Sequence, residues 1–181
     1  NVGGDIFSGT LTLRGLTLRN GCAAPASGNA GGGAVHVKKF SSLILDHVEL
    51  SGNTARSADG SGMAASGGAV YFTQATSVTI TGSSFLLNTA RSGSGELVSG
   101  ATGGALFIHN SHVTAITDSR FEENAAVGGD ASDGLGGSAD GGAVYAVFNQ
   151  IDSIERCSFT ANLVQGGTSA TSVGGGAAAG A

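Results

Sequence analysis

Proline, cysteine and charged residues are all scarce in this chain, and each shortage excludes a class of protein. The 181 residues include one Pro and two Cys, and only 12% are charged. A single Pro argues against a collagen-like chain or a Pro-rich linker. The two Cys are too few for a disulfide scaffold and too isolated for a zinc site. What is abundant is Gly, at 33 residues, which predicts many turns and short strands because Gly is costly inside helices.

The small number of cationic residues limits the partners of the chain. Eight Lys and Arg are scattered singly and the formal net charge is −5, so there is no basic stripe for nucleic acid. No apolar run approaches the roughly 20 residues that a membrane helix needs, and the sequence begins with neither Met nor a signal peptide. We therefore expect no nucleic acid partner and no membrane span in this segment.

One motif recurs along nearly the whole chain. Gly-Gly-Ala occurs at positions 32–34, 67–69, 103–105, 141–143 and 175–177. An apolar residue followed three positions later by Asn accompanies the first four copies, as Leu50/Asn53, Phe85/Asn88, Phe121/Asn124 and Phe159/Asn162. From each Ala to that apolar residue the spacing is 16 residues (34 to 50, 69 to 85, 105 to 121, 143 to 159). The spacing from Asn to the next Gly-Gly varies, so length changes are confined to one Gly/Ser-rich loop per repeat.

Constant spacing interrupted by one variable loop is typical of a solenoid, because a stacked core rejects insertions that a loop accepts. We predict an all-β, right-handed parallel β-helix with three short strands and one variable loop per coil of about 35 residues. The predicted coils run 1–31, 32–66, 67–102, 103–140 and 141–174, with a further coil beginning in 175–181. Neither end carries a capping element, so we expect a single β-helix segment excerpted from a longer protein.

Stacking turns equivalent residues into columns spaced by about 4.8 Å. The sequence predicts an aliphatic column of Val35, Val70, Leu106 and Val144. It predicts a second apolar column of Leu50, Phe85, Phe121 and Phe159. A polar ladder at a bend is expected from Asn53, Asn88, Asn124 and Asn162. A short amide suits such a bend because it caps the turn and passes hydrogen bonds between coils. Cys22 and Cys157 fall four coils apart, so no disulfide is expected between them.

The pairing of Gly-Gly-Ala-(Val/Leu) with Phe-x-x-Asn resembles the repeat of the chlamydial polymorphic outer-membrane proteins and of related bacterial β-helix surface proteins. The resemblance covers about residues 10–177. It implies a right-handed parallel β-helix passenger that is exported to the cell surface and used for adhesion. Leu50 departs from the pattern by replacing Phe, and fold transfers across such resemblances more safely than function does.

Two groups of residues are candidates for binding. An outward-facing aromatic column is predicted from His36, Tyr71, Phe107 and Tyr145. It serves either as a contact surface for sugars or another fibre, or as an aromatic ladder that stabilises the sheet. In the longest loop, Asp130, Asp133 and Asp140 offer oxygen ligands for calcium but lack the spacing of a recognised calcium loop. His109 and His112 lack a third ligand, so we expect no metal and no cofactor.

An enzyme is the alternative that many β-helix proteins suggest, since clustered carboxylates on one outward face serve polysaccharide chemistry. Two adjacent columns carry the candidates, Asp46, Thr81, Thr117 and Glu155 in one and His47, Gly82, Asp118 and Arg156 in the other. They offer the pairs Asp46/His47 and Glu155/Arg156. Solvated surface charges give the same pattern and no nucleophile triad is recognisable, so we expect no catalysis.

These patterns together predict a non-catalytic structural β-helix at the cell surface or in the extracellular space. The expected role is a stalk or fibre subunit whose partners are neighbouring copies of the same protein. The first alternative is an adhesin that binds a glycan or host surface, and the second is a carbohydrate-active β-helix enzyme. Concentration-dependent polymerisation, saturable binding and polysaccharide turnover distinguish the three.

Overall fold

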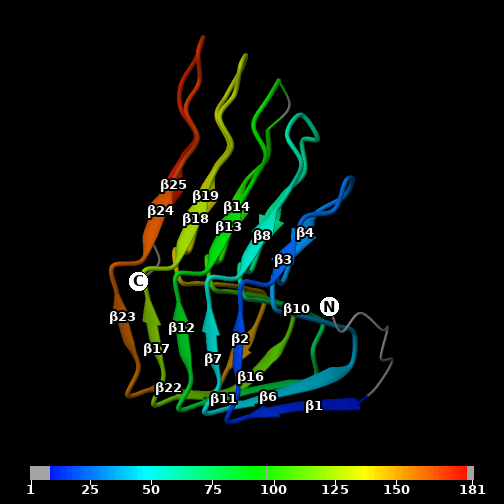
Figure 1. Cartoon of the computed structure of the whole chain (residues 1–181), viewed down its shortest axis with the longest axis vertical. Helices are drawn as coiled ribbons and strands as arrows, with labels where there is room; N and C mark the ends of the chain where they lie inside the picture. Colours follow the sequence, from blue (N-terminus) through cyan, green and yellow to red (C-terminus); the bar gives the residue numbers. More distant parts are fainter. Residues whose placement is uncertain (1–8, 97, 179–181) are drawn as a thin grey trace.

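The computed structural model describes residues 9–96 and 98–178. Its regular structure is entirely β-strand, and parallel strands stack in coils to form a β-solenoid of about five turns (Figure 1). This confirms the predicted fold class. Within the described ranges, no helix long and apolar enough to cross a membrane is present.

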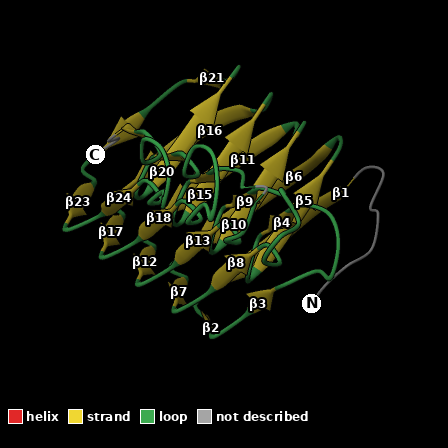
Figure 2. Ribbon diagram, turned by 90° about the horizontal axis from the view of Figure 1, so that it is seen from above, coloured by secondary structure: helices red, strands yellow, loops and turns green. Residues whose placement is uncertain are grey.

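In the described residues five parallel sheets run along the solenoid, and successive segments of a coil lie in successive sheets (Figure 2). Sheet 1 consists of β5 (Val35–Lys38), β10 (Val70–Thr73), β15 (Leu106–His109) and β20 (Val144–Val147). Sheet 2 consists of β1 (Gly9–Arg14), β6 (Ser41–Asp46), β11 (Ser77–Thr81), β16 (His112–Thr117), β21 (Gln150–Ile151) and β22 (Ile154–Glu155). Sheet 3 consists of β2 (Thr17–Arg19), β7 (Glu49–Ser51), β12 (Ser84–Leu86), β17 (Arg120–Glu122) and β23 (Ser158–Thr160).

The remaining two sheets come from the segment predicted to be a variable loop. Sheet 4 consists of β3 (Cys22–Ala23), β8 (Thr54–Arg56), β13 (Thr89–Arg91), β18 (Ala125–Val127) and β24 (Leu163–Gln165). Sheet 5 consists of β4 (Ala30–Gly31), β9 (Ala65–Ser66), β14 (Ala101–Thr102), β19 (Ala139–Asp140) and β25 (Ala177–Ala178). The segment is thus more regular than expected, and its length varies only between these two strands. Coils 1 to 5 are β1–β4, β5–β9, β10–β14, β15–β19 and β20–β25.

The molecule has two parts, which we call the body and the blade. Sheets 1, 2 and 3 form the body, whose interior holds large apolar side chains such as Phe72, Leu106 and Ile116. Sheets 4 and 5 run together in each coil as a finger, and the stacked fingers form a blade that projects from the body (Figure 1). The buried clusters of the blade contain only Ala, for example Ala90 and Ala126. Small side chains let its two sheets lie close together.

The corners of the body are turned by residues with positive φ. Between sheets 2 and 3 the φ values of Gly15, His47, Gly82, Asp118 and Arg156 lie between 51° and 58°. Only Gly adopts this left-handed conformation without strain, although polar residues with short local contacts also visit it. The side chain at this position points outward, which explains why Gly, His, Asp and Arg share one column.

The repeat changes in the first and last coils. Leu18 pairs with Leu50, which places Gly21 at the position of Asn53, so the first coil has no amide side chain at this bend. The fifth Gly-Gly-Ala is also displaced, because Ala177 pairs with Ala139 rather than with Ala143. Gly175 and Gly176 therefore belong to the fifth finger, and no new coil starts there as the motif had predicted. Residues 179–181, the rest of that predicted coil, lie outside the described residues, as do residues 1–8 of the first.

Candidate functional site

The predicted Asn ladder lies at the bend between sheets 3 and 4. Oδ1 of Asn88 accepts hydrogen bonds from the backbone N–H and from Nδ2 of Asn53, both at 3.0 Å. Nδ2 of Asn88 donates to the backbone carbonyl of Leu50 at 2.9 Å. The same pattern continues through Asn124 to Asn162. Because Asn53, Asn88 and Asn124 are fully buried, each amide satisfies backbone groups that would otherwise lose their partners.

The two predicted apolar columns lie inside the body. In sheet 1 the strand pairing brings together Val35, Val70, Leu106 and Val144. In sheet 3 it brings together Leu50, Phe85, Phe121 and Phe159. The Phe rings stack at centroid distances of 4.6 and 4.8 Å, close to the spacing of the strands themselves. Parallel stacking of coils thus produces ring stacking without further adjustment.

The aromatic column lies on the outer face of sheet 1, at its junction with the blade. Strand pairing aligns His36, Tyr71, Phe107 and Tyr145. Tyr71 and Phe107 are almost parallel, with centroids 4.9 Å apart, and Phe107 and Tyr145 are 5.8 Å apart. Parallel rings this close must overlap face to face, so the faces that a sugar would stack on are largely covered by neighbouring rings. The geometry favours a stabilising ladder.

Tyr71 links the body to the blade. A Cβ at Gly31 in sheet 5 would lie 2.8 Å from Cδ2 of Tyr71, so the ring rests on a position that only Gly leaves open. Burial raises the pKa of the Tyr71 hydroxyl above its ordinary value, since the phenolate would lose hydration. The ring therefore acts as a wedge in the inner corner between sheets 1 and 5.

The charged columns at the corner of sheets 2 and 3 form ion pairs. Arg156 contacts Asp118 through Nε at 2.6 Å and Nη2 at 2.9 Å, and its Nη1 contacts Glu155 at 3.0 Å. Asp46 contacts His47 and also Arg14, at 2.6 Å. Hydrogen bonds from His47 and Arg14 lower the pKa of Asp46, and those from Arg156 lower the pKa of Asp118. Neither carboxyl group has the raised pKa that a general acid needs.

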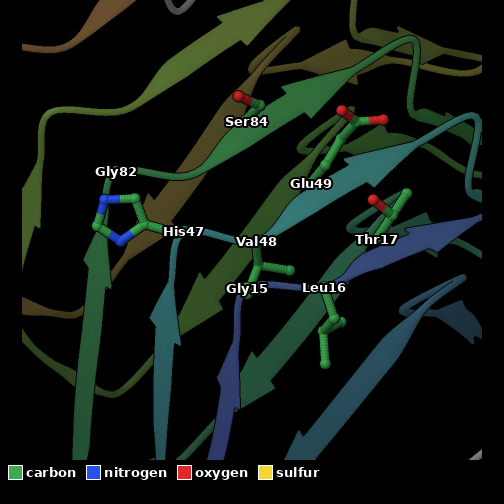
Figure 3. Close-up of a pocket in the computed structure, with 8 residues that line it drawn as sticks. All are labelled: Gly15, Leu16, Thr17, His47, Val48, Glu49, Gly82 and Ser84. Carbon is green, nitrogen blue, oxygen red and sulfur yellow. The ribbon is translucent and has the colours of Figure 1, made fainter.

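A shallow hollow of about 330 Å³ lies beside this corner (Figure 3). Thr17, Glu49 and Ser84 line it from adjacent strands of sheet 3. The imidazole of His47 lies over Gly82, where a Cβ would come within 2.9 Å of Nε2. Gly82 therefore makes room for the ring. Besides its polar groups, the hollow is lined by Leu16 and by the buried Val48.

Two of the three candidate calcium ligands, Asp130 and Asp133, accept hydrogen bonds from the next coil. Oδ1 of Asp130 accepts from the N–H and the Oγ1 of Thr168, both at 2.8 Å, which lowers its pKa. Oδ1 of Asp133 accepts from Oγ1 of Thr171 at 2.8 Å, and Asp140 lies on β19. Across the described part of the chain, His, Cys, Asp and Glu form no group of three able to hold a metal. The cysteines Cys22 and Cys157 are both free thiols, in coils 1 and 5.

Sequence reasoning missed a set of serine ladders. Oγ of Ser83 and Ser119 accepts the N–H of the preceding coil at the corner of sheets 2 and 3. Oγ of Ser57 and of Ser92 accepts instead the N–H of the following coil, where each finger leaves sheet 4. The available signal was the recurrence of Ser two residues before Phe and four residues after Asn. Serine hydroxyl oxygens thus accept hydrogen bonds from backbone N–H groups at several bends of the solenoid.

No family model, no curated protein and no solved structure matches this chain.

Proposed function

We propose that this chain is a non-catalytic structural element of an exported cell-surface or extracellular protein, a stalk or fibre segment that associates with neighbouring copies. The observation that carries the proposal is how burial depends on stacking. Phe85 and Phe121, with coils on both sides, are fully buried, whereas Leu18 and Phe159 in the outer coils are half-buried. Ile154 in coil 5 is 47% exposed although it continues the column of Ile116. Burial inside a coil is thus completed by the coils stacked on either side of it, which suits a rod built from repeated coils.

The surface chemistry supports a structural role. Asp46 and Asp118 pair with arginine. In the aromatic column Tyr71, Phe107 and Tyr145 stack on one another, and His36 meets Tyr71 edge-on. Such groups stabilise neighbouring coils, and their chemistry supports a scaffold better than an active site. The resemblance to the polymorphic outer-membrane repeat supports export to the cell surface.

An adhesin is the second candidate, and one observation favours it. The hollow beside His47 presents the hydroxyl groups of Thr17 and Ser84 and the carboxylate of Glu49 on one exposed face (Figure 3). Hydroxyl and carboxylate groups on adjacent strands suit the hydrogen bonds of a glycan. Saturable binding of a glycan that is lost in Glu49→Ala, with unchanged thermal stability, would support this candidate over the first.

Sedimentation velocity over a range of concentrations tests the structural proposal. We expect the average mass of the wild-type chain to rise with concentration. Ile154→Lys places a charge in the open core column and should block the rise, whereas Thr79→Lys, on the outer face of β11, should not. A wild-type chain that stays monomeric at every concentration overturns the proposal.

A further inference from the structure

The junctions between coils are not alike in their side-chain chemistry. Between coils 3 and 4 the side chains that hydrogen-bond to each other carry hydroxyl or amide groups, with two exceptions. Arg120 Nε donates to Ser84 Oγ at 2.9 Å, and His109 Nδ1 lies 3.4 Å from Thr73 Oγ1. Ser77 and Thr114 are joined at 2.9 Å, and the buried Asn88 contacts Asn124 at 3.0 Å. Within the described ranges, no carboxylate oxygen forms a hydrogen bond across this junction.

Between coils 4 and 5 four carboxylates bridge the junction at separate places. At the corner of sheets 2 and 3, Asp118 receives two hydrogen bonds from Arg156 at 2.6 and 2.9 Å. On the face of sheet 2, Oδ2 of Asp152 contacts Nε2 of His112 at 2.7 Å. In the blade, Asp130 receives two bonds from Thr168 and Asp133 one from Thr171, all at 2.8 Å. Carboxylates therefore hold both the body and the blade of coil 5 to coil 4.

The apolar contact across the same junction is smaller. The inward column of sheet 1 reads Val37, Phe72, Ile108 and then Ala146. Ile108 is fully buried, but Ala146 contributes less apolar surface to this column than Ile108 or Phe72 does, and sheet 2 is split here into β21 and β22. Less apolar burial means that the polar bridges carry a larger share of the docking of coil 5.

We infer that the junction between coils 4 and 5 is an acid-sensitive seam, which loosens when its carboxylates are protonated and then uncovers the strand edge of coil 4. The charged groups around each carboxylate are few. Arg156 and Glu155 surround Asp118, His112 and Gln150 contact Asp152, and Arg91 lies near Asp130. Protonation leaves Arg156 without its principal anion, and the uncovered edge offers unpaired backbone groups to another strand.

The direction and range of the pH effect follow from the carboxyl groups. Hydrogen bonds from Arg156, Thr168 and Gln150 lower the pKa values of Asp118, Asp130 and Asp152, respectively, below the ordinary value of 3.8. Their contribution is complete above that ordinary value and is lost as the pH falls through the lowered values. The seam therefore stays closed near neutral pH and opens in acid, below about pH 4.

Hydrogen exchange of the 181-residue chain between pH 6 and pH 3, corrected for intrinsic exchange rates, tests the seam. We expect the amides of β23 and β24 to lose at least tenfold more protection than those of β12 and β13. The variant Asp118→Asn, Asp130→Asn, Asp152→Asn should show weakened coil 5 protection already at pH 6 and little further change in acid. The control Ser77→Ala, Ser84→Ala, which removes contacts between coils 3 and 4 that involve no carboxylate, should keep the acid response of coil 5.

Two results would overturn the inference. One is a parallel loss of protection in coils 3 and 5 of the wild type as the pH falls. The other is a triple Asn variant that keeps the full acid response. If the triple variant does not fold, the comparison of coils within the wild-type chain still decides the question.

Discussion

The body and the blade both stack coil on coil, but the body packs large apolar side chains and the blade packs Gly and Ala. In the body, Phe85 and Phe121 fill the space between sheets, and their rings stack at 4.6 Å. In the blade, Gly and Ala let the backbones approach so closely that a Cβ at Gly129 would lie 1.9 Å from the carbonyl oxygen of Gly93. The body gains stability from buried apolar area, whereas the blade gains it from backbone hydrogen bonds such as Gly137 N–H to Gly129 O, at 2.9 Å.

One repeat therefore combines two kinds of packing, large buried side chains in the body and close backbone contacts in the blade. The Asn ladder lies at the boundary between them, where sheet 3 of the body turns into sheet 4 of the blade. In the body a loss of side-chain volume should be harmful, and in the blade a gain of volume should be harmful. The following predictions test that reversal.

The largest effect is expected from Phe121→Ala in the body. Phe121 is fully buried between Phe85 and Phe159, so its removal leaves a cavity and costs about 3–5 kcal/mol of unfolding free energy. Urea denaturation measures the change. Phe148→Ala, at a side chain that is 80% exposed, is the control and should cost far less. Equal costs at the two positions would contradict the assignment of the core.

The next effect is expected from Asn88→Ala at the boundary. The substitution removes the acceptor for the backbone N–H of Asn53 and the donor to Leu50 O, in a buried site. We expect a loss of about 3 kcal/mol in the same denaturation assay, because buried polar groups lose their partners. Asn110→Ala, at an exposed corner with φ of 48°, should cost only about 1 kcal/mol. If the Asn ladder does not stabilise the bend, Asn88→Ala and Asn110→Ala will cost the same unfolding free energy.

A smaller and more local effect is expected from Gly129→Ala in the blade. The added methyl group meets the backbone of Gly93 and should force the fingers of coils 3 and 4 apart, at about 2 kcal/mol. Hydrogen exchange should show lost protection in β13, β14, β18 and β19 with little change in β11 and β12. Gly176→Ala, where no atom lies within 4 Å, is the matched control. Loss of protection in the body to the same extent would mean that the two parts are not independent.

The smallest effect is expected at Tyr71, which joins the two parts. Its raised pKa means that the folded state holds the phenolic proton more tightly than the unfolded chain does. The resulting stabilisation is complete below the ordinary value of 10.0 and is lost as the pH rises through the higher folded value. The stability of the wild type should therefore decline more steeply above pH 10 than that of Tyr71→Phe. Identical alkaline profiles would place the hydroxyl in free solvent.

The body could be predicted from the sequence because large side chains recur at fixed spacing. Val70, Phe85 and Asn88 each occupy the column expected from the motif. The blade could not, because Gly, Ala and Ser carry little pattern, and a sheet held by backbone contacts leaves almost no side-chain periodicity. The fifth Gly-Gly-Ala was misplaced for the same reason, since Gly also serves inside the fingers.

The sequence predicted which charged residues share a column, but it did not predict that they form ion pairs. The alignment of Asp118 with Arg156 follows from the repeat, but the sequence did not distinguish a catalytic group from an ion pair. That distinction depends on side-chain direction at a corner with positive φ. The same geometry brings Arg14 to Asp46 across the first two coils.

Electron microscopy of the native full-length material tests the central claim most directly. If the chain is a segment of a structural rod, the images will show filaments of constant width that grow by adding subunits along the solenoid axis. Discrete short particles at all concentrations, or isolated rods that project from a membrane, would contradict assembly into fibres and place adhesion first.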